Sequence, residues 1–111
     1  MRSATRKHTG KDPAYRAFIA AQPCFICRLF KQYQQTRTEI AHVGERGLSQ
    51  KCPDRETLPA CAWHHRLGPE SLHRLGVKFW QRWGLDKAKL LAEYQYRFQV
   101  WDAGIPTPWV R

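Results

Sequence analysis

Apolar side chains recur with a helical period in three stretches of the chain, which predicts three helical regions. The first begins at Asp12-Pro13, because Asp12 can cap a helix and Pro13 suits its first turn. The second runs from Pro69 to Gly84, and the third begins after Asp86. Their apolar faces comprise Tyr15, Phe18 and Ile19 in the first; Leu72, Leu75, Val77, Phe79, Trp80 and Trp83 in the second; and Leu90, Leu91, Tyr94, Phe98 and Trp101 in the third. The aromatic members of the last two faces could stack on bases, but at helical spacing we assign them to packing.

The middle of the chain lacks this period and predicts two short strands. Residues 38–43, TEIAHV, are the first, and Thr57-Leu58 is a second brief one before a proline. Another helix is expected to begin within residues 61–65 and to be interrupted by the following Gly-Pro pair. These elements predict an α+β fold in a single domain, residues 12–111, preceded by a flexible basic arm, residues 1–11.

The charge of the chain favours a nucleic-acid partner. Its 111 residues include 19 Lys and Arg against 9 Asp and Glu, a formal net charge of +10. The basic residues are spread along the chain, which indicates a charged face rather than one basic tail, although charge alone leaves a plain basic protein equally open. No apolar run is long enough for a membrane span and no signal core follows the N-terminus, so we expect a cytoplasmic protein without membrane contact.

Two pairs of residues with the same spacing predict a structural zinc site. Cys24 and Cys27 form a CxxC pair, and Cys61 and His64 repeat its spacing with histidine as the second member. Together they make the closed four-ligand set of structural zinc, which would stabilise a small core. The alternatives are ordinary buried cysteines or a redox CxxC, but a redox motif belongs in an α/β pattern that is absent here. Cys52 could replace His64 as a ligand; we expect it to be a free thiol.

Three further histidines supply parts for phosphodiester hydrolysis. The reaction needs a base for water and a cation on the phosphate. An imidazole, with an ordinary pKa of ~6.5, can act as the base, and two neutral imidazoles can hold a divalent metal. His42 ends the first predicted strand, and a strand–loop–strand–helix arrangement could bring it together with His65 and His73. Each histidine taken alone is more commonly exposed to solvent or hydrogen-bonded in the structure.

The segments CFIC, TEIAHVGERG and LPACAWHHRLGPESLHRLG resemble, in this order, the motifs of small HNH (ββα-metal) endonucleases of phage and prophage type. The resemblance covers roughly residues 22–100 and follows the pattern C-x2-C, AH, PLC-x2-HH and H-x-L-G. It implies a ββα-metal core with a short two-stranded hairpin, a zinc-ribbon-like staple and flanking helices, in a protein encoded by a bacterium or a phage. It also implies nicking or cleavage of DNA with Mg²⁺ or Mn²⁺.

The same resemblance assigns roles to the histidines. It implies that His42 is the general base, that His65, which follows the last zinc ligand, binds the catalytic metal, and that His73 is the third histidine of the motif. Ala41 stands where many members have a metal-ligating Asp or His, so the third protein ligand of the catalytic metal stays open.

The chain also has no Asn to fill the structural asparagine position of the motif. Asp54, Glu56 or Thr57 stands near that position, and we choose Asp54 as the residue that supports the catalytic site.

Four basic residues are predicted to contact DNA. Arg46 and Lys51 lie on the loop after His42 and could touch phosphates, and Arg66 and Arg74 adjoin the other histidines and could clamp the scissile phosphate. For any one of them, plain solvation is the alternative.

The second hypothesis is a non-catalytic zinc-ribbon module that binds nucleic acid. It fits the charge and the zinc ligands but leaves the three histidines unexplained. A RING-like adaptor would need two zinc sites, for which the chain has too few cysteines. DNA specificity, a partner from recombination, repair or a phage, and the oligomeric state stay open.

Overall fold

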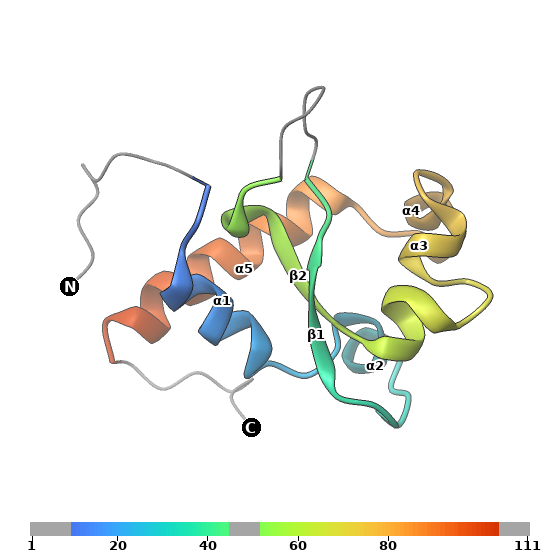
Figure 1. The fold of residues 1–111 in the computed structure, drawn as a ribbon, viewed down its shortest axis with the longest axis horizontal. Coiled ribbons are helices and arrows are strands. Elements are labelled where there is room, and N and C mark those ends of the chain that lie inside the picture. Colours follow the sequence, from blue (N-terminus) through green and yellow to red (C-terminus); the bar gives the residue numbers. More distant parts are fainter. Residues whose placement is uncertain (1–9, 45–51, 105–111) are drawn as a thin grey trace.

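The computed structural model describes residues 10–44 and 52–104. The elements are α1 (Pro13–Ala20), α2 (Phe25–Leu29), β1 (Thr38–His42), the 3₁₀ turn η1 (Asp54–Glu56), β2 (Thr57–Cys61), the π-helical turn η2 (Trp63–Leu67), α3 (Leu72–Leu75), α4 (Lys78–Trp83) and α5 (Lys87–Asp102). The strands pair antiparallel, with Thr38 opposite Cys61 and His42 opposite Thr57. The predicted α+β class is confirmed as a set of helices around one two-stranded hairpin (Figure 1).

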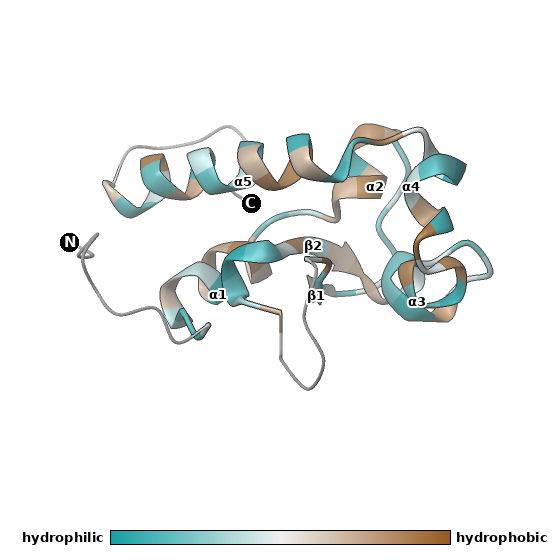
Figure 2. Ribbon diagram, turned by 90° about the horizontal axis from the view of Figure 1, so that it is seen from above, coloured by the Kyte–Doolittle hydropathy of each residue, from teal (hydrophilic) through white to brown (hydrophobic). Residues whose placement is uncertain are grey.

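An aromatic core joins the hairpin to the first and last helices. Phe98 of α5 packs against Tyr15 and Phe18 of α1, with ring centroids 4.9 and 5.6 Å apart. Every residue of β2 is buried, because α1, α2 and α5 all pack against this strand. Figure 2 shows α5 as a separate layer across from α1 and the hairpin. Burial of these large rings is the main hydrophobic contribution to the fold.

The helix boundaries follow the predicted capping residues. The carboxylate of Asp12 accepts a hydrogen bond from the backbone N–H of Tyr15, and that of Asp86 accepts one from Lys89. Gly84 ends α4 with a φ of 67°, a conformation that glycine adopts without strain. The predicted faces are buried in α1 and α5: Tyr15, Phe18, Ile19, Leu90, Tyr94 and Phe98, with Leu91 and Trp101 partly buried.

Two local predictions were wrong. The second strand extends to Cys61 because it pairs with the whole of β1. The helix expected from Pro69 is divided into α3 and α4 at Gly76, which has a φ of 58°. As a result Val77 lies 89% exposed instead of in the core.

Part of the predicted basic arm, residues 1–9, and the loop with Arg46 and Lys51 lie outside the described residues. Within the described part, the carbonyl of Gly10 accepts a hydrogen bond from the backbone N–H of Asp54. No helix in residues 10–44 and 52–104 combines the length and the apolar character of a membrane span.

Candidate metal centre and catalytic site

Four buried side chains meet between α2 and the end of the hairpin, and they could hold a metal ion such as zinc. Cys24 caps α2 and Cys27 lies within it, while Cys61 ends β2 and His64 lies in η2. Their ligand atoms all lie within 4.8 Å of one another. Among the described residues, no other group of three or more potential ligands is as close. The predicted ligand set is therefore brought together by the fold.

The distances in this cluster fit a tetrahedral ion. Nδ1 of His64 lies 3.6 Å from the sulfurs of Cys24 and Cys27 and 3.3 Å from that of Cys61. The sulfurs of Cys27 and Cys61 are 4.0 Å apart. Tetrahedral zinc bonds imply separations of roughly 3.6 Å between sulfur and nitrogen and about 3.8 Å between two sulfurs. These four separations lie within a few tenths of an ångström of the tetrahedral values, and no ligand-atom separation in the cluster exceeds 4.8 Å, so a zinc ion would draw the wider pairs together by up to about 1 Å.

The charge state of the cluster also suits a cation. Burial raises the pKa values of the Cys24 and Cys27 thiols, and burial lowers the pKa of His64. Neutral thiols are therefore favoured without a cation, whereas a bound dication stabilises thiolates. Metal binding here would release protons. Cys52 is outside the cluster: its buried thiol lies 3.5 Å from the carbonyl oxygens of Pro53 and Glu56.

Next to this cluster, the structure brings His65 and His73 into contact. Their rings meet edge to face with centroids 4.7 Å apart. His65 lies in η2 and His73 in α3, so the pair is made by two elements and not by one helical face. Nδ1 of His65 is 2.8 Å from Oε1 of Glu39, on β1. This bond holds one nitrogen of His65 and leaves Nε2 for another ligand.

Glu39 is held from the other side by an arginine. Arg66 donates from Nε to Oε1 at 3.0 Å and from Nη2 to Oε2 at 2.8 Å. The pKa of Glu39 is lowered, and the largest cause is the hydrogen bond from Arg66. Burial raises this pKa, and the hydrogen bond from His65 lowers it further. Burial is likewise the main cause of the lowered pKa of His65, although Glu39 opposes it. At neutral pH Glu39 is therefore ionised and His65 is neutral, as a metal ligand must be.

The remaining histidine pairs with the predicted supporting carboxylate. Nε2 of His42 lies 3.0 Å from Oδ1 of Asp54, and Oδ2 of Asp54 accepts the backbone N–H of Asp12 at 2.8 Å. Arg16 also reaches Oδ1, at 3.4 Å. Burial raises the pKa of Asp54, but these hydrogen bonds and the charge of Arg16 outweigh it, so that the pKa is lowered. Since an ionised carboxylate only accepts, Nε2 of His42 carries the proton and Nδ1 is left as an acceptor.

The two pairs remain separate in the described residues, where no hydrogen bond or ring contact joins His42 to His65 or His73. Both pairs use β1. Glu39 and His42 are three residues apart on this strand. This spacing places their Cα atoms about 10 Å apart and directs their side chains to opposite faces of the sheet. Ala41, between them, is 1% exposed and has no ligand atom.

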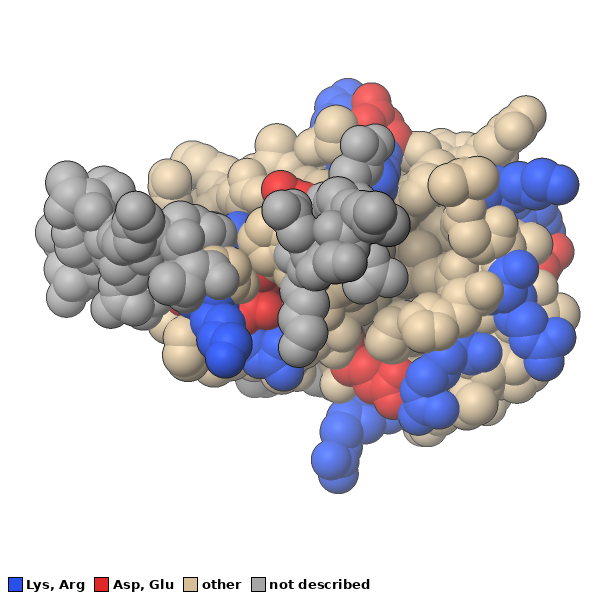
Figure 3. Space-filling view, turned by 45° about the horizontal axis from the view of Figure 1, so that its top comes forward, with Lys and Arg blue, Asp and Glu red and all other residues tan. Residues whose placement is uncertain are grey.

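The basic residues beside the histidines differ in whether they have an ion-pair partner. Arg66 is committed to Glu39, and Arg82 to Glu70 at 2.8 Å. Arg74 and Lys78 are exposed, and their side chains have no ion-pair partner among the described residues. Figure 3 shows Lys and Arg side chains gathered at the end of the molecule where α3 and α4 lie. Arg74 therefore remains available as a phosphate contact.

Comparisons with protein-family models, curated proteins and solved structures gave no match for this chain. The resemblance to HNH endonucleases therefore stays an expectation from the sequence motifs.

One residue of this site was missed from the sequence. Glu39 lies in TEIAH, two positions before Ala41 and on the same face of the strand, which was the available signal. Its contact with His65 spans 26 residues of sequence and depends on how η2 follows β2.

Proposed function

We propose that this chain is an HNH-type, metal-dependent DNA endonuclease, with His42 as general base and one divalent cation held by His65 and His73. The observation that carries the proposal is the contact between His65 and His73, together with the hydrogen bond that Nδ1–H of His65 donates to Glu39, which leaves Nε2 for a metal. Carboxylate–histidine–metal arrangements of this kind recur in metal sites. The Cys24, Cys27, Cys61 and His64 cluster is proposed as a structural zinc site, closed to substrate.

In this proposal His42 and Asp54 act on the attacking water. Asp54 holds Nε2–H of His42, so Nδ1 can accept the proton of the water as it attacks phosphorus. A bound Mg²⁺ or Mn²⁺ would stabilise the charge that develops on the phosphate and on the leaving oxygen. Arg74 would hold a neighbouring phosphate oxygen. The hydrogen-bonded state of His42 and Asp54 supports this assignment, because a general base needs a fixed tautomer.

The scissile phosphate must then bridge the two pairs around β1. Among residues 10–44 and 52–104 the sheet has two strands, so in this part of the chain β1 has an open edge around which side chains of both faces can reach. A phosphodiester bound at this edge would have to join groups that lie on opposite faces of β1.

The test is nicking of a supercoiled plasmid with Mn²⁺ by zinc-loaded protein. His42→Ala should lower the rate by about 10²- to 10⁴-fold, the usual contribution of a general base, while DNA binding is retained. His8→Ala, to which no role is assigned, is the matched control for loss of an imidazole. Nicking by His42→Ala at the wild-type rate would refute the assignment.

The second candidate is the non-catalytic zinc-ribbon module, and the buried Ala41 favours it, because one strand ligand of the usual catalytic metal is missing. If neither wild type nor His42→Ala nicks DNA but both bind it, this candidate replaces the first.

A further inference from the structure

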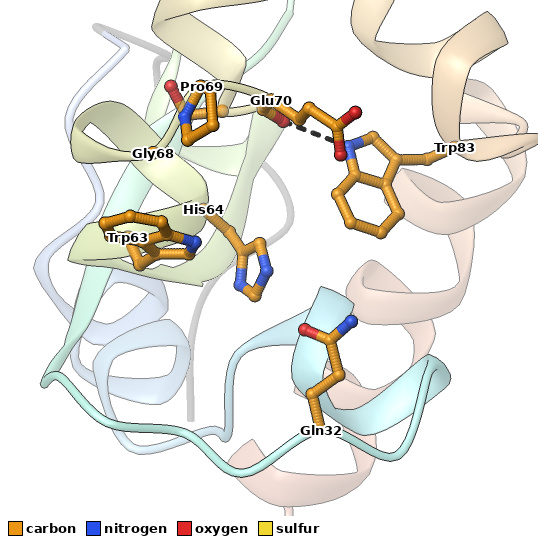
Figure 4. A pocket seen from close by; sticks show the side chains of 8 residues that line it. Gln32, Trp63, His64, Gly68, Pro69, Glu70 and Trp83 are labelled. Carbon is orange, nitrogen blue, oxygen red and sulfur yellow. Dashed lines mark hydrogen bonds between the residues drawn. The ribbon is translucent and has the colours of Figure 1, made fainter.

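A small cavity lies beside the Cys3His cluster, away from His42. Its volume is about 180 Å³, and its walls come from η2, the turn after α2, the Gly-Pro segment and the end of α4. Figure 4 shows His64 between Trp63 and Trp83, with its ring directed toward Gln32. None of the proposed catalytic residues lines this cavity. It is therefore a second place at which a ligand could be held.

Two indole rings form the apolar walls. Trp63 is 51% exposed, although it is a large apolar side chain, and it packs over Gly68, where an added Cβ would lie 2.8 Å from its ring. Trp83 is fixed, because its Nε1 donates to the carbonyl of Glu70 at 3.0 Å. A half-exposed tryptophan beside a cavity offers a flat surface for stacking at little cost in side-chain order.

The polar wall contains an unused donor. His64 is only 7% exposed, and its Nδ1 faces the three sulfurs. The cavity therefore meets the opposite edge of the ring, where Nε2 has no hydrogen-bond partner among the described residues. With a metal on Nδ1, Nε2 carries the proton and can only donate. The side-chain amide of Gln32, for which the same part of the structure shows no partner, offers both a donor and an acceptor. The ligand must present at least one acceptor, for His64.

We propose that this cavity takes one unstacked nucleobase of a DNA strand. A cavity of this size is smaller than the roughly 300–1,000 Å³ of sites for drug-sized ligands, so it suits one ring system. A base is flat and carries carbonyl or ring-nitrogen acceptors for His64 and Gln32. Lys31 is exposed next to Gln32, where it can meet a flanking phosphate.

Two other occupants fit the cavity less well. A quaternary ammonium group would need a negative wall, but the carboxylate of Glu70 is paired with Arg82 and the His64 N–H would repel a cation. An aromatic side chain of a protein would leave the donors of His64 and Gln32 unused. The inference takes DNA as the ligand from the proposed function and adds that the preferred substrate has single-stranded or frayed character.

The experiment is fluorescence anisotropy with zinc-loaded protein and no added Mg²⁺ or Mn²⁺, so that no hydrolysis occurs. The probes are a labelled single-stranded oligothymidylate and an oligonucleotide of the same length whose sites are all abasic. Trp63→Ala should weaken binding of the oligothymidylate by roughly 5- to 100-fold and leave binding of the abasic strand unchanged. Tyr96→Ala, which removes another exposed aromatic ring, is the matched control and should change neither affinity.

Equal affinity of wild type and Trp63→Ala for the oligothymidylate overturns the proposal, and so does an equal loss for both strands. Should Trp63→Ala fail to fold, Trp63→Phe takes its place in the binding assay. A second measurement on the wild type then follows the Nε2–H resonance of His64 as thymidine monophosphate is added. The nucleotide should shift this resonance, and the absence of a shift at saturation refutes base binding. Base-dependent binding without plasmid nicking would reject the proposed endonuclease activity and support base binding in the cavity. Plasmid nicking without base-dependent binding would support the endonuclease and reject base binding in the cavity.

Discussion

Replacement of Glu39 tests whether this carboxylate orients His65 toward a metal. Glu39→Ala removes the acceptor of the His65 Nδ1 proton, and Glu39→Gln keeps an acceptor oxygen but removes the charge. In the wild type the bond fixes the tautomer with hydrogen on Nδ1, so that Nε2 presents a lone pair. Without it the two tautomers compete and the ring can turn. We expect Mn²⁺ to bind more weakly to both variants, and most weakly to Glu39→Ala.

The size of this loss follows from the geometry. The Nδ1–Oε1 distance of 2.8 Å is that of a charge-assisted hydrogen bond, which contributes about 1.5–3 kcal/mol. The side chains are 15% and 27% exposed, so solvent screens part of this interaction. Loss of such outer partners weakens metal binding by about 10- to 100-fold, or roughly 1.4–2.8 kcal/mol. Glu39→Ala should fall in this range, and Glu39→Gln near or below its lower end.

The assay is titration of Mn²⁺ into zinc-loaded protein, with free Mn²⁺ measured by electron paramagnetic resonance. Glu70→Gln is the matched control, because Glu70 also pairs with an arginine at 2.8 Å but has no histidine partner in the described part of the chain. Nitrogen-15 spectra of the imidazoles provide a second readout, in which His65 should show the Nδ1–H tautomer in wild type and a tautomer mixture in Glu39→Ala. Wild-type Mn²⁺ affinity in Glu39→Ala, with an unchanged His65 spectrum, would refute the reasoning.

Two further predictions concern stability. Cys61→Ser should lose zinc and unfold at room temperature, because structural zinc contributes about 10–16 kcal/mol in small metal domains while a whole domain is stable by about 5–15 kcal/mol. Zinc content and thermal melting measure this. The control is Cys52→Ser, at a buried position outside the cluster, which should keep both zinc and fold. Asp54→Asn should be less stable than wild type by roughly 1.5–3 kcal/mol at neutral pH. Since the folded pKa of Asp54 is lowered, its contribution is present above its unfolded pKa and is lost as the pH falls below about 4, so the gap between variant and wild type should close in acid. Urea denaturation across this range decides, and a gap that does not narrow between neutral pH and about pH 3 contradicts the prediction.

Local spacing allowed part of this site to be predicted. Each half of the Cys3His cluster is an i, i+3 pair, which needs only one turn of chain to aim both ligands at one point, so the ligand set was visible in the sequence. The capping carboxylates of Asp12 and Asp86 were visible for the same reason. The partnership of His42 with Asp54 was predicted only as general support, because its geometry depends on the turn η1 that precedes β2.

Long-range contacts set the limit of the sequence analysis. Apolar spacing across residues 69–83 is helical, but it cannot show that Gly76 adopts a positive φ and divides the helix. The contacts of His65 with Glu39 and with His73 join three elements, and each requires the pairing register of the hairpin and the direction in which the chain leaves it. The direction in which the chain leaves the hairpin cannot be predicted from the order of residue types alone.

The turn η2 connects the three proposed sites through consecutive residues. Trp63 faces the cavity, His64 the cysteines and His65 the carboxylate of Glu39. The backbone bond from the N–H of Gly68 to the carbonyl of Trp63, 2.8 Å long, closes a π-helical turn, a form found often at functional sites. Neighbouring residues of such a turn point in different directions, so a metal that fixes His64 also fixes the orientation of the side chains on either side. In the proposed arrangement no substrate atom binds the ion, yet the ion would determine where both Trp63 and His65 lie. Loss of that ion should therefore disturb base binding and Mn²⁺ binding together, although it touches neither ligand.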